Sequence, residues 1–250
     1  MWLHDAGMII GFIALTFLLA GLVKGTIGLG LPTVAVGLLG LVMPPVEAAA
    51  LLVVPSLVTN AWQLAGGPSV LALLGLVRRL WPMLVGIGVG TWMAAGSLSG
   101  GRGAAVAMGV ALVGYGVFGL ARGPLLVPGR WEAVLGPVVG VLNGAITAAT
   151  GIFVLPSVPY LGGLGLGREA LIQALGLSFT VSTLALAGAL GPGLFRADAL
   201  GGSVLALLPA LVGMWAGTWL RGRVRVEVFR RWFFAGLVVL GGHLAVSNLL

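Results

Sequence analysis

Long apolar stretches, separated by short polar or glycine-rich connections, run through nearly the whole chain. A helix needs roughly 17–25 apolar residues to cross the hydrocarbon core of a membrane, and this length divides the chain into ten apolar segments. The segments are residues 8–23, 27–43, 47–66, 80–98, 104–121, 132–148, 151–166, 169–190, 201–220 and 230–249. The pattern predicts an all-α polytopic integral membrane protein.

The basic residues predict how the segments cross the membrane. If all ten cross and the N-terminus is outside, eleven of the 13 basic residues fall in inner loops, and only Arg102 and Arg196 fall in outer loops. The inner group is Lys24, Arg78, Arg79, Arg122, Arg130, Arg168, Arg221, Arg223, Arg225, Arg230 and Arg231. Lys and Arg are enriched in inner loops, so we expect both termini outside a cytoplasmic (inner) membrane. The first two segments, and likewise the sixth and seventh, have almost no loop between them. Re-entrant hairpins there would leave the other loops on the same sides.

Composition agrees with a membrane protein. Hydrophobic residues make up 59% of the chain and charged residues 8%, against about 25% charged in soluble domains. The net charge is +7, and the basic residues lie between apolar segments. They form no basic face with stacking aromatics. The expected partner is therefore the lipid bilayer, and no nucleic acid is expected. With no cysteine and two distant histidines, no metal site or cofactor is expected. The first segment lacks preceding basic residues and is expected to be a retained helix.

The two halves of the chain repeat each other. The matching stretches are PMLVGIGVGTWM with PALVGMWAGTWL, GLVKGTIG with GVLNGAIT, and VEAAALLVVPS with REALIQALGLS. Each half holds five segments, an odd number, so the second half enters the membrane from the opposite side. We predict an N-terminal repeat over residues 1–122, an inner loop over 123–131 and an inverted C-terminal repeat over 132–250. Inverted repeats are typical of secondary transporters.

A helix break is predicted at the same position of each half. In VKGTIGLGLPT (23–33), Pro32 cannot donate a backbone hydrogen bond, and the glycines lower the cost of leaving helical geometry. NGAITAATGIFVLP (143–156) is expected to break in the same way. Freed backbone groups cost about several kcal/mol each in hydrocarbon, so such breaks occur where protein or a polar cavity surrounds them. The paired breaks predict one shared site.

The residues at both breaks favour an anion. The helix after each break is expected to present unpaired N–H groups and a positive dipole end. The candidate binding residues are Lys24, Gly25, Thr26, Gly28, Gly30, Thr33, Asn143, Gly144, Thr147, Thr150 and Gly151. These donors suit a small oxyanion and include no carboxylate for a cation. Alternatively, the glycines only let helices cross closely, and Lys24 extends to the inner interface.

Intramembrane amides and hydroxyls add further candidates. Asn60 and Gln63 are three residues apart on one helical face, and Gln173 and Ser178 are their looser counterparts in the eighth segment. Such side chains either contact the substrate or hydrogen-bond between helices.

Glu47 and Glu169 begin helices at paired repeat positions. A carboxylate there stabilises the helix dipole. The alternative role is proton coupling, because a transport cycle that accumulates its substrate needs a coupled ion.

The stretch GLVKGTIGLGLPTVAVGLL, followed by EAAALLVVPSLVTNAWQL and RRLWPMLVGIGVGTWM, resembles the sulfite exporter TauE/SafE family of membrane permeases. The likeness covers nearly the whole chain. It implies transport of sulfur-containing anions such as sulfite, thiosulfate or organosulfonates. The family glycines correspond to Gly25, Gly28, Gly30, Gly144 and Gly151. The chain departs from the family pattern at Leu31-Pro32 and over 147–150, so the two half-sites are expected to be chemically unequal.

The sequence therefore predicts a secondary transporter for a small, sulfur-containing oxyanion, working by alternating access, with the proton as candidate coupling ion. An anion channel is the first alternative, because the same donors could line a pore. A membrane-embedded enzyme or assembly factor is the second. An enzyme needs a nucleophile, an acid–base pair or a metal set, and the sequence offers none of these, so we expect no enzyme.

Overall fold

The computed structural model describes residues 2–66, 69–95, 102–121, 126–191 and 197–249. The described residues form ten α-helices, and eight of them are long and apolar enough to cross a membrane. The helices are α1 (Trp2–Ile27), α2 (Leu31–Leu39), α3 (Pro45–Ala65), α4 (Val70–Met93), α5 (Arg102–Leu120), α6 (Gly129–Thr150), α7 (Ser157–Gly163), α8 (Arg168–Leu190), α9 (Ala197–Arg221) and α10 (Val226–Leu249). The all-helical, polytopic class is confirmed.

Two predicted segments do not form helices of spanning length. Segment 27–43 yields α2 with 9 residues, and segment 151–166 yields α7 with 7 residues. At about 1.5 Å per residue, each covers less than half of a hydrocarbon core of about 30 Å. A short non-helical stretch joins each of them to the long helix before it. Each hairpin therefore pairs one long helix with one short helix.

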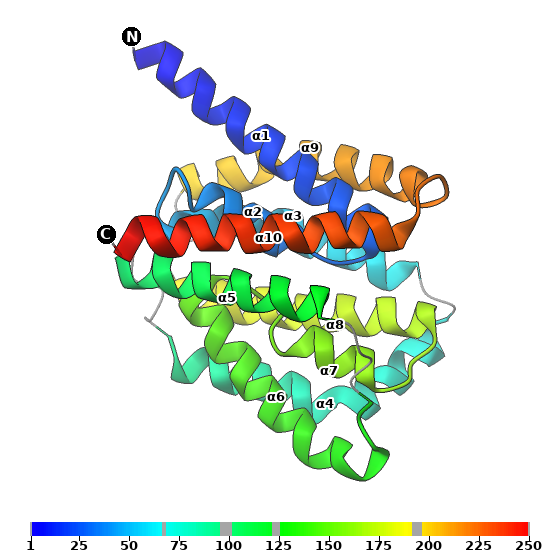
Figure 1. The fold of residues 1–250 in the computed structure, drawn as a ribbon. Coiled ribbons are helices and arrows are strands. Elements are labelled where there is room, and N and C mark those ends of the chain that lie inside the picture. Colours follow the sequence, from blue (N-terminus) through cyan, green and yellow to red (C-terminus); the bar gives the residue numbers. More distant parts are fainter. Residues whose placement is uncertain (1, 67–68, 96–101, 122–125, 192–196, 250) are drawn as a thin grey trace.

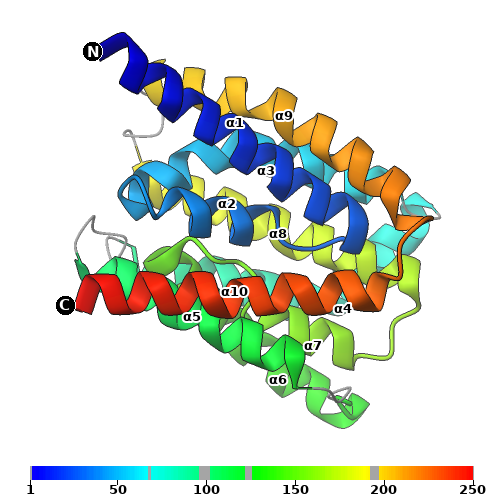
Figure 2. The ribbon, with the colours of Figure 1, turned by 45° about the horizontal axis from the view of Figure 1, so that its top comes forward.

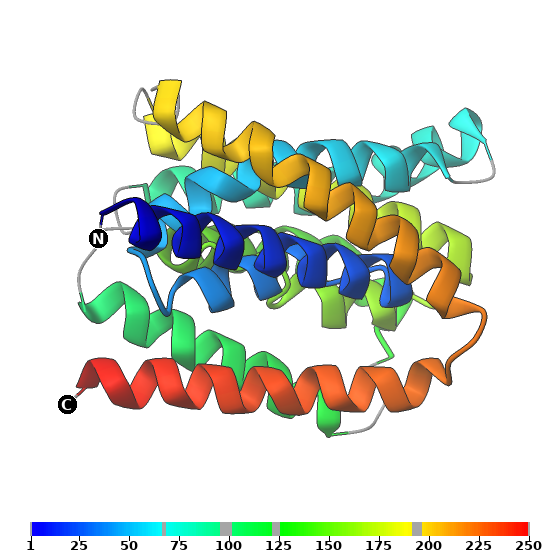
Figure 3. The ribbon, with the colours of Figure 1, turned by 90° about the horizontal axis from the view of Figure 1, so that it is seen from above.

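Successive helices run back and forth along one direction, so the two ends of the chain lie at the same end of the bundle (Figure 1, Figure 2). The short helices keep this alternation, and α2 and α7 lie in opposite halves of the bundle. Figure 3, seen from above, shows α1 and α9 running in the same direction. Opposite the chain ends, α8 and α10 begin and α9 ends. We call this the arginine end, because it carries Arg168, Arg221 and Arg230.

Three helix pairs pack backbone against backbone: α1 with α9, α4 with α6, and α5 with α10. A Cβ added at Gly25 would lie 2.2 Å from the Met214 carbonyl oxygen, and one added at Gly144 would lie 2.1 Å from that of Ile87. The sequence repeat pairs Gly25 with Gly144 and Met214 with Ile87, so both contacts use matching positions. Only glycine permits this spacing. The matched contacts support the inverted repeat, whose boundaries stay a prediction.

Helices α3 and α8 form the antiparallel centre of the bundle. They contact each other, and α3 also contacts α9 as α8 contacts α4. The Gln63 amide donates to the Ile172 carbonyl at 3.1 Å, and the Gln173 amide donates to the Leu64 carbonyl at 3.1 Å. These two bonds fix the register. Extended along antiparallel helices, this register sets the middle of α3 opposite the middle of α8.

Candidate functional site

The first helix break is confined to Gly28–Gly30. Gly28 and Gly30 have φ angles of +78° and +98°, which residues other than glycine rarely adopt. The Gln63 amide donates to the Gly28 carbonyl at 3.1 Å, so α3 satisfies one backbone group freed by the break. The prediction that the break includes Gly25 is wrong. Gly25 is helical, because α1 continues to Ile27 and needs this glycine for its contact with α9.

Pro32 also has a different place from the one predicted. It is the second residue of α2, where a helix has no hydrogen bond for the proline to remove. Helix α2 starts at Leu31 because Gly30, in a left-handed conformation, ends the break directly before it. Thr33 follows in the same first turn and is completely buried.

The second break follows Gly151, which has φ of +72°. The prediction that it begins at Asn143 is wrong, because α6 stays helical to Thr150. Asn143 is buried inside α6. With its amide nitrogen towards the break, it donates to the carbonyls of Phe153 at 2.9 Å and Leu155 at 3.0 Å. This orientation is the one the contacts favour, because carbonyl oxygens only accept hydrogen bonds.

Two threonines complete the second break. The Thr147 hydroxyl donates to the Ile152 carbonyl at 3.2 Å, and the Ile152 N–H donates to the Thr150 hydroxyl at 3.2 Å. Gly144 lies within α6 and packs against α4. The short helix that follows does not present a free first turn as predicted, because the Val158 N–H donates to the Val154 carbonyl at 3.0 Å.

Lys24 is a buried basic side chain near the first break. Its side chain is 2% exposed, so it does not extend to the interface. Its ammonium donates to the Thr59 hydroxyl at 3.0 Å and to the Asn60 side-chain oxygen. Over the described ranges, the one ion pair joins Arg79 to Glu132, and Lys24 has no carboxylate partner. Burying an ammonium group without a counter-charge costs about several kcal/mol of folding free energy, because the ion loses its hydration.

Several other buried polar atoms are unpartnered. In the described part of the chain, the buried atoms Thr33 Oγ1, Ser56 Oγ, Asn60 Nδ2 and Ser178 Oγ have no hydrogen-bond partner. Roughly 90% or more of buried polar groups in proteins have one. The register of α3 and α8 places Ser56 and Ser178 near the middle of the two helices. Of these residues, Asn60 contacts Lys24, because its side-chain oxygen accepts from the Lys24 Nζ.

The second half has a matching contact of different chemistry. The Asn143 amide contacts the Ser182 hydroxyl at 3.3 Å, and the sequence repeat pairs Asn143 with Lys24 and Ser182 with Asn60. The first half thus carries a cation where the second carries an amide. The structure therefore places two chemically unequal contacts at the paired positions.

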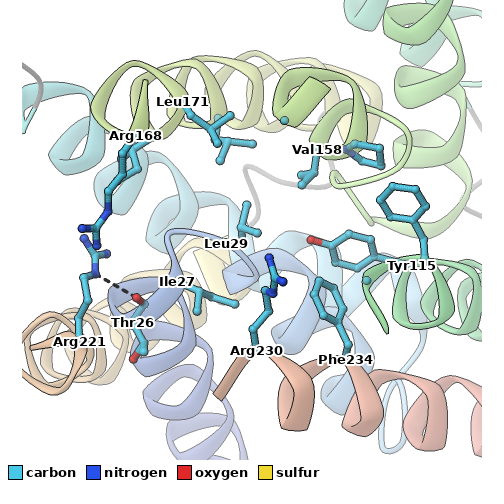
Figure 4. A pocket seen from close by; sticks show the side chains of 16 residues that line it. Thr26, Ile27, Leu29, Tyr115, Val158, Arg168, Leu171, Arg221, Arg230 and Phe234 are labelled. Carbon is cyan, nitrogen blue, oxygen red and sulfur yellow. Dashed lines mark hydrogen bonds between the residues drawn. The ribbon is translucent and has the colours of Figure 1, made fainter. Parts of the chain in front are cut away.

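A cavity of about 370 Å³ lies at the arginine end, between the two broken hairpins (Figure 4). The first break contributes Leu29, and α7 contributes Val158 and Pro159. Of the residues predicted as site residues, Thr26 lines it. The Thr26 hydroxyl donates to the Leu22 carbonyl at 2.8 Å.

Sequence reasoning did not identify three arginines as site residues. Arg168, Arg221 and Arg230 come from α8, α9 and α10 and line this cavity. Arg221 donates through Nε to the Thr26 carbonyl at 3.0 Å and through Nη2 to the Gly25 carbonyl. It thereby caps the last turn of α1, where cations are favoured. The sequence pattern favours an orientation signal for these arginines, and for Arg221 and Arg230 it is also compatible with attraction to anionic lipid.

The remaining candidates lie elsewhere. Glu47 and Glu169 are exposed in the first turns of α3 and α8, which begin at opposite ends of the bundle (Figure 2). The structure thus brings neither carboxylate to Lys24. Gln173 is buried and bonds to the backbone of α3.

The fold defines the class of the protein: a polytopic helical membrane protein with two helix breaks and a set of buried polar side chains. The family model "Sulfite exporter TauE/SafE" matches residues 13–244. The chain belongs to this family, and the predicted resemblance is confirmed. Its members are permease-type transporters, so the chain is a membrane transport protein. A search of curated proteins and a search of solved structures give no match.

Proposed function

We propose that the chain is a secondary transporter that moves a small, sulfur-containing oxyanion, such as sulfite, thiosulfate or an organosulfonate, across the cytoplasmic membrane. The observation that carries this proposal, beside the family, is Lys24. It is a buried ammonium held by two neutral oxygen acceptors and by no carboxylate within the described residues. An anion would supply the missing counter-charge.

The proposed binding groups are hydrogen-bond donors that have unused capacity. Besides the Lys24 ammonium, they are the Thr33, Ser56 and Ser178 hydroxyls and the Asn60 amide nitrogen. Oxyanions accept several hydrogen bonds, and charge-assisted bonds are roughly twice as strong as neutral ones.

A second group of candidate residues holds the breaks in shape. Gln63, Asn143, Thr147 and Thr150 already bond to backbone groups in or beside the breaks. We assign them the role of stabilising non-helical backbone inside the membrane, where unsatisfied backbone groups are costly.

Alternating access follows from the inverted repeat. Two related halves of opposite orientation can exchange conformations and open a central site to either side in turn. The matched glycine contacts of α1 with α9 and of α6 with α4 support this part of the proposal. In the proposed topology, both termini are outside, and the arginine end faces the cytoplasm.

Proton coupling is the proposed energy source. Glu47 and Glu169 occupy paired repeat positions, are exposed, and lie in helices that begin at opposite ends of the bundle. Each could therefore exchange protons with one aqueous side. The test is the double variant Glu47→Gln/Glu169→Gln, which should keep anion exchange but lose the response to a pH gradient.

An uptake panel in proteoliposomes tests the proposed function. Sulfite, thiosulfate, sulfate, small sulfonates and carboxylates are offered with and without a proton gradient. We expect sulfur oxyanions to enter faster than into protein-free liposomes. If no anion in the panel moves, the proposal is wrong.

A further inference from the structure

The cavity at the arginine end has an unusual charge balance. Arg168, Arg221 and Arg230 line it, and among the described residues that line it there is no Asp or Glu. Arg168 and Arg221 carry the same charge, and Figure 4 draws their guanidinium groups as neighbours at one side of the cavity. Positive charges around a partly enclosed space attract an anion and raise its local concentration.

A buried hydroxyl faces the same space. Tyr115 is 1% exposed, and its hydroxyl has no hydrogen-bond partner among the described residues. The hydroxyl points into the cavity, towards Leu29 and Arg230 (Figure 4). The ring is held in place by an edge-on contact with Phe234, with 5.1 Å between the ring centroids. A fixed, buried donor without an acceptor indicates a place for a ligand oxygen.

We propose that this cavity is a second anion site, which binds an oxygen-rich anionic group of the sulfonate, sulfite or phosphate type. Arg168, Arg221 and Arg230 supply the charge, and the Tyr115 hydroxyl supplies a neutral hydrogen bond. This inference rests on the proposed transport function for its role, as the site that receives the anion before it reaches Lys24.

Arg221 connects this site to the first break. Two of its N–H groups cap the carbonyls of Gly25 and Thr26. A guanidinium has five N–H donors, so the others can hold an anion at the same time. A ligand in the cavity would therefore contact Arg221, the side chain that caps the end of α1 close to Gly28.

Two sources could supply the same chemistry. A soluble oxyanion would fill the polar side of the cavity. The headgroup of an anionic lipid could bind the same arginines and place its chains against the apolar walls, which include Ile27, Leu171 and Leu175.

Binding is measured directly, by isothermal titration of the purified chain in detergent with sodium sulfite and, separately, with sodium phosphate. We expect saturable binding of at least one anion. The cavity variants are made in a Lys24→Met background, so that the proposed Lys24 site does not contribute to the measured binding. In this background, Arg230→Gln and Arg168→Gln should each lower the anion affinity of the cavity by about tenfold, because each removes a charge-assisted hydrogen bond. Tyr115→Phe should weaken it less, by about threefold. The matched control is Arg225→Gln, because Arg225 is exposed between α9 and α10 and does not line the cavity.

Nanodiscs distinguish the two sources. Discs of phosphatidylcholine alone are compared with discs that contain phosphatidylglycerol. Inhibition of sulfite binding by phosphatidylglycerol, absent in Arg230→Gln, would identify a lipid headgroup as the competing occupant. In the Lys24→Met background, equal binding by the parent, Arg230→Gln and Arg225→Gln, or no binding of any of these anions, overturns the site. Transport that persists in Arg230→Gln with unchanged affinity rejects this inference and leaves the proposed function standing. Wild-type binding without transport rejects only the proposed function.

Discussion

Gly90 and Gly88 lie two residues apart on α4 but have different surroundings. A Cβ at Gly90 would lie 2.0 Å from the Val141 carbonyl oxygen of α6, whereas a Cβ at Gly88 would have nothing within 4 Å. Ordinary van der Waals contact begins at 3.4 Å. Gly90→Ala must therefore separate α4 from α6 by about 1.4 Å at this point, or bend one of them, because interiors are close-packed.

We expect Gly90→Ala to cost about 3 kcal/mol, the upper end of the range for overpacking, because backbone atoms cannot rotate away as side chains do. For a chain of this size, that is a fall of about 6–12 °C in Tm. Gly88→Ala should leave Tm unchanged or raise it slightly, because alanine favours the helix by about 1 kcal/mol. Thermal unfolding in detergent, followed by the fluorescence of the eight tryptophans, measures both.

The repeat adds a second test of the same reasoning. Gly217 is the counterpart of Gly90, and a Cβ there would lie 2.1 Å from the Leu22 carbonyl oxygen of α1. Gly217→Ala should therefore lower Tm about as much as Gly90→Ala. Equal Tm values for Gly90→Ala and Gly88→Ala would refute the packing argument. A neutral Gly217→Ala beside a destabilising Gly90→Ala would refute the matched packing of the two halves.

Other substitutions probe the buried polar residues and one candidate coupling carboxylate. Lys24→Met should leave Tm unchanged or raise it, because it removes an uncompensated buried charge, while it lowers sulfite affinity in uptake assays about tenfold or more; unchanged affinity would exclude Lys24 from the site. Asn143→Leu should lower the free energy of unfolding by about 2 kcal/mol, because the Phe153 and Leu155 carbonyls lose their donor, and chemical denaturation that matches wild type would contradict this role. Glu169→Gln alone should reduce the stimulation of uptake by a pH gradient without changing exchange of labelled sulfite at equal pH, and full stimulation would exclude this carboxylate from coupling.

The spanning helices could be predicted from the sequence because their apolar length is a local property. Eight of the predicted segments form helices of spanning length. The lengths of α2 and α7 could not be predicted in the same way. Their flanks are as apolar as their helical residues, and their ends depend on tertiary contacts. Gln63 from α3 satisfies the Gly28 carbonyl, and Asn143 satisfies the carbonyls after Gly151.

Glycine explains the errors at the breaks. Gly28 turns the chain in a left-handed conformation, whereas Gly25, three residues earlier, lets α1 touch α9. Both roles are filled by the same residue type within one motif, and only the position of α9 distinguishes them.

The arginine cavity could be predicted only in part. Positive charge at one end of the bundle follows from the loop pattern. The meeting of Arg168, Arg221 and Arg230 around one cavity depends on how α8, α9 and α10 are placed, as does the position of the Tyr115 hydroxyl. Tyr115 lies in an apolar segment without a polar neighbour in sequence, so nothing local indicated its role.

Counterflow measures the central claim most directly. Proteoliposomes are loaded with unlabelled sulfite and diluted into a trace of radiolabelled sulfite, with the membrane potential clamped to zero. For an alternating-access transporter we expect a transient accumulation of label above its equilibrium level. This accumulation should be smaller in Lys24→Met at the same sulfite concentration. A channel would let the label only equilibrate. Monotonic equilibration, or no uptake above protein-free liposomes, would contradict the account.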